Sequence, residues 1–171
     1  MNLEIWAGIV ALALVLPAIW LYNGLVGERN LARQGFADID VQLKRRTDLV
    51  PQLVEAVRGY AGYEKALLTT VTELRSAALS QPVIAKRFEK EKDLGEGLRQ
   101  LVLLQENYPQ LKADTVFRDL SARLVEIEDA LQAARRFYNG AVKQYQTRIE
   151  SFPDLIVAKL LGFRPMPFFS L

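Results

Sequence analysis

The sequence contains no cysteine and no histidine among its 171 residues. Without cysteine the chain can form no disulfide bond, and it offers no thiolate as a nucleophile or a metal ligand. Without histidine it lacks the side chain that most often binds metals and that most often serves as a general base near neutral pH. We therefore expect no catalytic residue, no metal site and no bound cofactor, and we predict that the protein is not an enzyme.

The chain also lacks a strong excess of either charge. It carries 22 Lys and Arg against 20 Asp and Glu, which gives a net charge of +2. Nucleic-acid binding depends on attraction to phosphates, so this balance predicts no nucleic-acid partner. The tyrosines at positions 60, 63, 138 and 145 could in principle stack on bases, but their helical spacing favours a place in the core or at its edge.

Neighbouring acidic residues raise the alternative of a metal site. Such pairs occur at Glu89 and Glu91 and again at Glu126, Glu128 and Asp129. Helical di-metal proteins join their carboxylates through Glu-x-x-His motifs that project inward. Since histidine is absent and these acids are interpreted as falling off the apolar stripe, we expect them to lie in solvent.

The apolar segment Ile5–Tyr22 contains no charged residue. As a helix it would extend over roughly 27 Å, which is close to the hydrocarbon thickness of a bilayer. Trp6 lies near one end and Trp20 near the other, where aromatic rings favour the membrane interfaces. A cleaved signal peptide and a buried core helix are the alternatives, but no basic residue precedes the segment. We predict that residues 1–23 form an extracytoplasmic N-terminus and a single transmembrane anchor in the lipid bilayer.

The position of the first basic residues predicts the orientation in the membrane. Arg29 and Arg33 are the first bases after the uncharged segment. Because basic residues concentrate on the cytoplasmic side, we expect a single-pass protein of the cell membrane whose N-terminus is outside and whose remaining chain is cytoplasmic.

Apolar residues after the anchor recur at intervals of three and four, and no stretch alternates with a period of two. This spacing is typical of amphipathic helices and predicts an all-α protein. We expect helices at about 24–59, 63–79, 82–107 and 115–150, joined as an antiparallel four-helix up-and-down bundle of long helices over 24–150. Pro51 predicts that the first helix kinks or restarts near 48–51, with Asp48 as the new cap. The glycines at 59 and 62 predict a turn or hinge.

The last segment, 151–171, is an apolar tail in which we expect a short helix capped by Asp154 and closed by Gly162. If four helices alternate in direction, the tail lies beside the membrane. One hypothesis is that its apolar residues insert into the membrane interface; the other, slightly favoured because bases are few, is that they cover the bundle or contact a second copy. The candidate contact residues are Leu160, Phe163, Phe168 and Phe169.

Several ordered motifs resemble the hallmark of the LemA family. They are Asp38–Arg46, Asp48–Val54, Gly59–Ala61, Glu106–Ala113, Phe137–Asn139, Ser151–Pro153 and Phe168–Phe169. The resemblance covers nearly the whole chain, with a departure at Gly62 and Tyr63, where more polar residues are expected. It implies bacterial single-pass membrane proteins that form a bundle of long helices and have no established enzymatic activity. Some relatives are associated with the formation of magnetosome membranes.

A charged cluster around the expected kink is the best candidate interaction site. It consists of Asp38, Asp40, Lys44, Arg45, Arg46 and Asp48. It could bind an acidic partner segment or a lipid headgroup. The alternative is that these charges form a solvated face with a cap, while Arg46, which occupies a core slot, pairs with a carboxylate of a neighbouring helix.

These observations favour a membrane-anchored helical interaction or scaffold protein. We expect it to self-associate, to contact a protein partner whose identity the sequence does not reveal, and to take part in membrane organisation. The alternative is a signalling or regulatory adaptor whose bundle switches at the Pro51 kink and the Gly59–Gly62 hinge.

Overall fold

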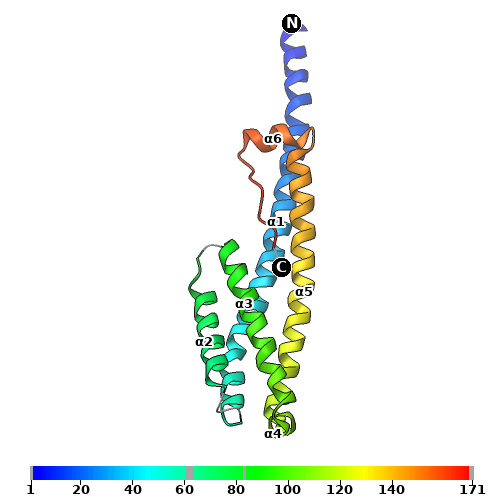
Figure 1. Ribbon diagram of the computed structural model, residues 1–171. Coiled ribbons are helices and arrows are strands. Elements are labelled where there is room, and N and C mark those ends of the chain that lie inside the picture. Colours follow the sequence, from blue (N-terminus) through cyan, green and yellow to red (C-terminus); the bar gives the residue numbers. More distant parts are fainter. Residues whose placement is uncertain (1, 61–63, 83, 170–171) are drawn as a thin grey trace. The chain divides into compact units, whose positions relative to one another are not determined.

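The computed structural model describes residues 2–60, 64–82 and 84–169, except for the side chains of 2–5, 7, 10, 11, 14, 84 and 85. Every regular element of this described part is helical, which confirms the all-α prediction. The elements are α1 (Asn2–Arg58), α2 (Lys65–Ser80), α3 (Ile84–Leu103), the 3-10 helix η1 (Leu104–Glu106), α4 (Pro109–Ala113), α5 (Thr115–Glu150) and α6 (Asp154–Leu160) (Figure 1).

The chain divides into two compact units. Unit 1 comprises Met1–Phe36 and Arg136–Phe168, and unit 2 comprises Ala37–Arg135 and Phe169–Leu171. The helices α1 and α5 each contribute to both units, because their bounds extend past residues 36 and 136. The shorter helices α2, α3 and α4 belong to unit 2, and α6 belongs to unit 1.

Within unit 2, α1 continues through Pro51, and the expected restart near 48–51 does not occur. Proline has no N–H to donate to the carbonyl four residues earlier, so the carbonyl of Thr47 loses its helical partner. In the structure this oxygen accepts a hydrogen bond of 3.0 Å from Arg75 Nε of α2. The freed carbonyl is thus satisfied by another helix. Asp48 caps nothing and instead pairs with Lys44 at 3.5 Å on the exposed surface.

One hydrophobic core holds unit 2 together, and α1 to α5 all contribute to it. Its most deeply buried members include Leu53, Val71, Leu94, Leu111 and Phe117. Gly97 explains how α2 and α3 approach each other closely: a Cβ atom there would lie 3.3 Å from both Leu74 Cδ1 and Val71 Cγ2. Gly97 therefore serves the packing between α2 and α3.

The connection before α5 is more structured than the sequence predicts. The helix expected to reach residue 107 ends at Leu103, η1 takes the place of its last turn, and α4 follows. Asp114 then caps α5, because its Oδ1 accepts a hydrogen bond of 2.8 Å from the N–H of Phe117. Its Oδ2 accepts a second bond of 2.8 Å from the hydroxyl of Tyr60. These two hydrogen bonds hold the pKa of Asp114 below its usual value, the bond from Phe117 having the larger effect.

Unit 1 has a smaller core, formed by Leu25 of α1, Tyr145 and Ile149 of α5, and Ala158 of α6. The end of α6 is closed by Gly162, whose φ of 70° is accessible to glycine. This turn lets the N–H of Phe163 donate to the carbonyl of Ala158 at 2.9 Å. Asp154 does not cap α6 as expected, since it accepts a hydrogen bond of 2.9 Å from Arg148 Nε.

The N-terminal part of α1 contains the segment Ile5–Tyr22, for which the sequence predicts a transmembrane helix. Several of its side chains lie outside the described residues. Within the described part of the chain, no helix meets the length and apolar character needed to cross a membrane. The expected hinge at Gly59–Gly62 also falls partly on residues 61–63, which lie outside the described part.

Candidate functional site

Arg46 occupies the centre of unit 2, where its side chain is only 1% exposed. Its Nη2 donates to Glu91 Oε2 at 2.7 Å and to the main-chain carbonyl of Glu91 at 2.6 Å, and its Nη1 donates to Glu128 Oε1 at 2.7 Å. The guanidinium therefore links α1 to α3 and α5. A buried charge is tolerated only when it is paired and hydrogen-bonded, and the planar guanidinium suits carboxylates well.

Gly95 makes room for this guanidinium on α3. A Cβ atom at that position would lie 3.0 Å from Arg46 Nη1, which is closer than ordinary contact. Glu91 is as deeply buried as Arg46, at 2% exposure of its side chain, whereas the side chain of Glu128 is 33% exposed. The ion pair between Arg46 and Glu91 is therefore closed to solvent. In the pair with Glu128, solvent reaches the carboxylate but not the guanidinium.

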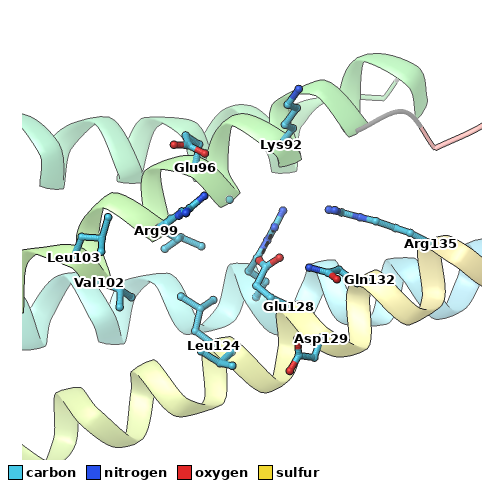
Figure 2. Close-up of a pocket in the computed structure, with 14 residues that line it drawn as sticks. Lys92, Glu96, Arg99, Val102, Leu103, Leu124, Glu128, Asp129, Gln132 and Arg135 are labelled. Atoms are coloured by element: carbon cyan, nitrogen blue, oxygen red, sulfur yellow. Dashed lines mark hydrogen bonds and ion pairs between the residues drawn. The ribbon is translucent and has the colours of Figure 1, made fainter.

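A cleft of about 520 Å³ lies beside this arginine, lined by residues of α1, α3 and α5. Lys92, Glu96 and Arg99 of α3 and Glu128, Gln132 and Arg135 of α5 line it, and Figure 2 shows the Lys92 side chain pointing away from α5. Apolar side chains line the rest of the cleft: Leu98, Val102, Leu103, Leu124 and Val125. An apolar surface bordered by charges of both signs is suited to contact with another polypeptide segment.

Arg135 borders the same cleft and contacts the tail of the chain. Its guanidinium lies 4.5 Å from the centre of the Phe169 ring, which in turn packs on Phe88 with 3.8 Å between ring centres. Burial, followed by repulsion from Arg46, lowers the pKa of Arg135, while Glu128 and Glu91 oppose that shift. The carboxylates thus help to keep a half-buried second guanidinium charged near the first.

The structure separates the members of the predicted charged cluster. Arg46 is buried, as the alternative interpretation expects, and pairs with carboxylates of two other helices. Asp40 pairs with Arg87 of α3 at 2.6 Å. Asp38 and Arg45 are exposed on α1, as are Lys44 and Asp48. The exposed charges therefore form a solvated face and do not converge on one site with Arg46.

The sequence interpretation missed both partners of Arg46. Glu91 was expected in solvent, but it is buried because it lies three residues after Phe88 and three before Leu94, both of which belong to the core. That spacing places it on the apolar stripe of α3. Glu128 lies four residues after buried Leu124 and three before buried Leu131, at the edge of the stripe on α5. The same periodicity that identifies the core could therefore have identified both acids.

The tail residues differ in their surroundings. The side chains of Leu160 and Phe168 are exposed, Phe169 is buried, and Phe163 is half-buried between two residues of α1. The Phe163 ring meets Tyr22 edge-on with 6.0 Å between centres, and Arg29 lies 4.9 Å above it.

Within unit 1, three side chains of α5 bind the backbone of the tail. The hydroxyl of Tyr138 donates to the carbonyl of Pro167 at 2.6 Å, and that of Tyr145 donates to the carbonyl of Arg164 at 2.9 Å. Gln146 Nε2 donates to the carbonyl of Met166 at 2.8 Å. Burial raises the pKa of both tyrosines, which keeps their hydroxyls protonated as donors.

Comparison with known proteins identifies relatives of this chain. The family model described as LemA family matches residues 35–171. Protein LemA of Metamycoplasma hominis is 25% identical over 149 residues, covering 86% of this chain and 68% of that protein. Magnetosome protein MamQ of Magnetospirillum gryphiswaldense is 21% identical, covering 92% of this chain and 67% of the relative. Magnetosome protein MamQ 2 of Paramagnetospirillum magneticum is also 21% identical and is covered to 68%.

Proposed function

Because this chain belongs to the LemA family, we infer that it is a membrane-associated helical scaffold. In this proposal the N-terminal part of α1 associates with a lipid bilayer, and the helices that follow residue 23 contact other proteins, including further copies of the chain. Its similarity to proteins named for the magnetosome supports a role in membrane organisation.

The observation that carries the proposal is an exposed apolar surface at the start of α1. Large apolar side chains are more than half exposed there, namely Trp6, Ile9, Leu12, Val15, Leu16, Ile19 and Trp20. No Asp, Glu, Lys or Arg occurs between Glu4 and Glu28. Such a surface is costly in water, since each apolar side chain that leaves water gains about 1.5–3 kcal/mol when fully buried. A lipid bilayer provides the burial that the rest of unit 1 does not.

Vesicle flotation tests this association. The full chain is mixed with lipid vesicles and centrifuged through a density gradient, beside a variant that carries Ile9→Glu, Leu12→Glu and Leu16→Glu. We expect the unaltered chain to float with the vesicles and the variant to stay at the bottom. Val116→Glu is the matched control, because Val116 is equally exposed but lies at the start of α5. Equal flotation of the triple variant would contradict the proposal.

Photo-crosslinking in cells tests whether the cleft beside Arg46 contacts another polypeptide. A photoreactive residue replaces Arg99 or Asp129, which are exposed and line the cleft, and Asp119 on α5 serves as an exposed control outside it. We expect adducts from the two cleft positions that the control does not give. Adducts to a second copy support a self-associating scaffold, adducts to another protein support a hetero-partner, and the absence of adducts from both positions contradicts a role for the cleft.

A further inference from the structure

The outer surface of α6 is apolar although it faces solvent. Ile156 and Leu160 are four residues apart on α6 and so lie on one side of it, and Phe152 lies two residues before the helix; all three are exposed. Leu161 extends this surface at the end of the helix. The opposite side, with Asp154 and Ala158, is buried against α1 and α5. We refer to Phe152, Ile156, Leu160 and Leu161 as the α6 stripe.

Within unit 1, α6 packs close to the end of the apolar segment of α1. Ala158 packs on Leu25, the first buried residue after the exposed segment. Phe163, just past α6, meets Tyr22, the last residue of that segment. The α6 stripe therefore lies at the level of α1 where the uncharged, exposed segment ends.

The direction of α6 is also informative. Figure 1 shows α6 running across α1 and α5 of unit 1, whereas α1 and α5 run alongside each other there. If the start of α1 enters a bilayer, a short helix that crosses it at the end of the apolar segment lies along the membrane interface. An apolar stripe on such a helix is buried in the boundary between headgroups and acyl chains.

Charges around the stripe distinguish lipid from a second copy of the chain. Lys159 on α6 and Arg164 just after it are exposed. Arg148, by contrast, already pairs with Asp154 and Glu28. In a two-fold contact the same patch faces itself, so Lys159 and Arg164 of two copies would be brought together and would repel. Lipid phosphates would instead attract both side chains.

We propose that the α6 stripe docks on the surface of an anionic lipid bilayer, with Lys159 and Arg164 facing the headgroups. This inference rests on the proposed membrane association of α1. It assigns part of the tail to lipid and leaves Phe163 and Phe169, which contact protein, to internal packing.

The absence of cysteine allows a direct test, because an introduced cysteine is a unique labelling site. Leu160→Cys carries an environment-sensitive fluorophore, and Leu79→Cys on α2 is the control, since Leu79 is also exposed. Vesicles of phosphatidylcholine with phosphatidylserine are then added. We expect the emission at position 160 to rise several-fold and to be quenched by lipids that carry a quencher near the headgroup, whereas position 79 stays unchanged.

Tryptophan fluorescence in the same samples separates the two proposals, because both tryptophans, Trp6 and Trp20, lie in the apolar segment of α1. A tryptophan blue shift without a response at position 160 would overturn the α6 inference alone. No tryptophan response would overturn both. If the fluorophore emission at position 160 rose without vesicles, and the rise grew with protein concentration, a second copy would cover the α6 stripe. That result would overturn the inference.

The charge contribution gives a second readout. Lys159→Ala and Arg164→Ala should each weaken binding to anionic vesicles by about fivefold, which corresponds to about 1 kcal/mol for each basic residue near an anionic surface. Binding to vesicles of phosphatidylcholine alone should not change. Lys143→Ala is the control, because Lys143 is an exposed base on α5. Equal binding of all three variants to anionic vesicles would contradict the proposed headgroup contact.

Discussion

Two arginines, one in each unit, have similar partners but different exposure. Arg46 in unit 2 lies 2.7 Å from carboxylate oxygens of both Glu91 and Glu128. Arg148 in unit 1 lies 2.9 Å from Asp154 and 3.9 Å from Glu28. The side chain of Arg46 is 1% exposed and that of Arg148 is 25% exposed. Similar ion pairs are thus shielded from water in one unit and reached by it in the other.

This difference shows that exposure, more than the identity of the partners, determines what each arginine contributes. The side chains of Asp154 and Glu28 are 13% and 28% exposed, so water reaches both when the guanidinium leaves, and the loss is limited. Water cannot reach Glu91, so loss of Arg46 would leave an uncompensated buried charge. Unit 2 should therefore depend on its arginine far more than unit 1 does.

Removing Arg46 should have the largest effect. We expect Arg46→Ala to lower the free energy of unfolding by about 3–5 kcal/mol, because Glu91 would remain buried without a partner. Chemical denaturation followed by circular dichroism measures this change. Arg45→Ala is the matched control, since Arg45 is adjacent and exposed. Equal stability of the two variants would show that the pair is not structurally important.

A double variant sharpens the same comparison. Replacing Arg46 by Met and Glu91 by Leu removes both buried charges at once, and apolar pairs of similar volume are often neutral or stabilising. We expect the double variant to recover most of the stability that Arg46→Ala loses. A double variant as unstable as Arg46→Ala would indicate that the cost arises from packing and not from the charge left on Glu91.

Removing Arg148 should have a smaller effect. We expect Arg148→Ala to cost about 1–2 kcal/mol, mainly through the lost hydrogen bond to Asp154. Because water reaches this pair, added salt should reduce the difference between the variant and the unaltered chain. Thermal unfolding at low and high salt measures it. A loss as large as that of Arg46→Ala, with no salt dependence, would contradict the distinction between the two arginines.

The smallest effects concern a glycine beside each arginine. An added Cβ atom at Gly24 would overlap the guanidinium of Arg148, and one at Gly95 would lie 3.0 Å from Arg46 Nη1. Arg148 can move into solvent, whereas Arg46 is held by three hydrogen bonds. We expect Gly95→Ala to destabilise by about 1 kcal/mol, and Gly24→Ala to cost no more than Arg148→Ala, because it displaces the same guanidinium.

Gly140→Ala is the control for this comparison, because no atom lies within 4 Å of an added Cβ there. It should stabilise α5 by up to about 1 kcal/mol through helix propensity alone. If Gly24→Ala proved more costly than Arg148→Ala, the account of a movable Arg148 would be wrong.

Local sequence patterns account for much of this fold. The three-four spacing of apolar residues predicts an all-α chain, and it places the last long helix at 115–150, where the structure has Thr115–Glu150. The cap of this helix is local in the same way, because Asp114 accepts its hydrogen bond from Phe117, only three residues along the chain. Such features are determined by residues a few positions apart in the chain, so they can be predicted from the sequence.

Features that depend on distant residues could not be predicted in this way. The continuity of α1 through Pro51 depends on Arg75, which lies 28 residues from Thr47 in the chain. The partners of Arg46 lie 45 and 82 residues away, so the buried pair could be anticipated only as one alternative. The division of the tail between exposed and buried residues also depends on contacts with α1, α3 and α5, which no local pattern encodes.

Fractionation of cells that produce the full chain tests the central claim most directly. Lysates are centrifuged at high speed, and the membranes are then washed with high salt. We predict that the chain stays with the membranes, that the variant with Ile9→Glu, Leu12→Glu and Leu16→Glu moves to the supernatant, and that Val116→Glu behaves like the unaltered chain. Recovery of the unaltered chain in the supernatant, or retention of the triple variant in the membranes, would contradict membrane association through α1.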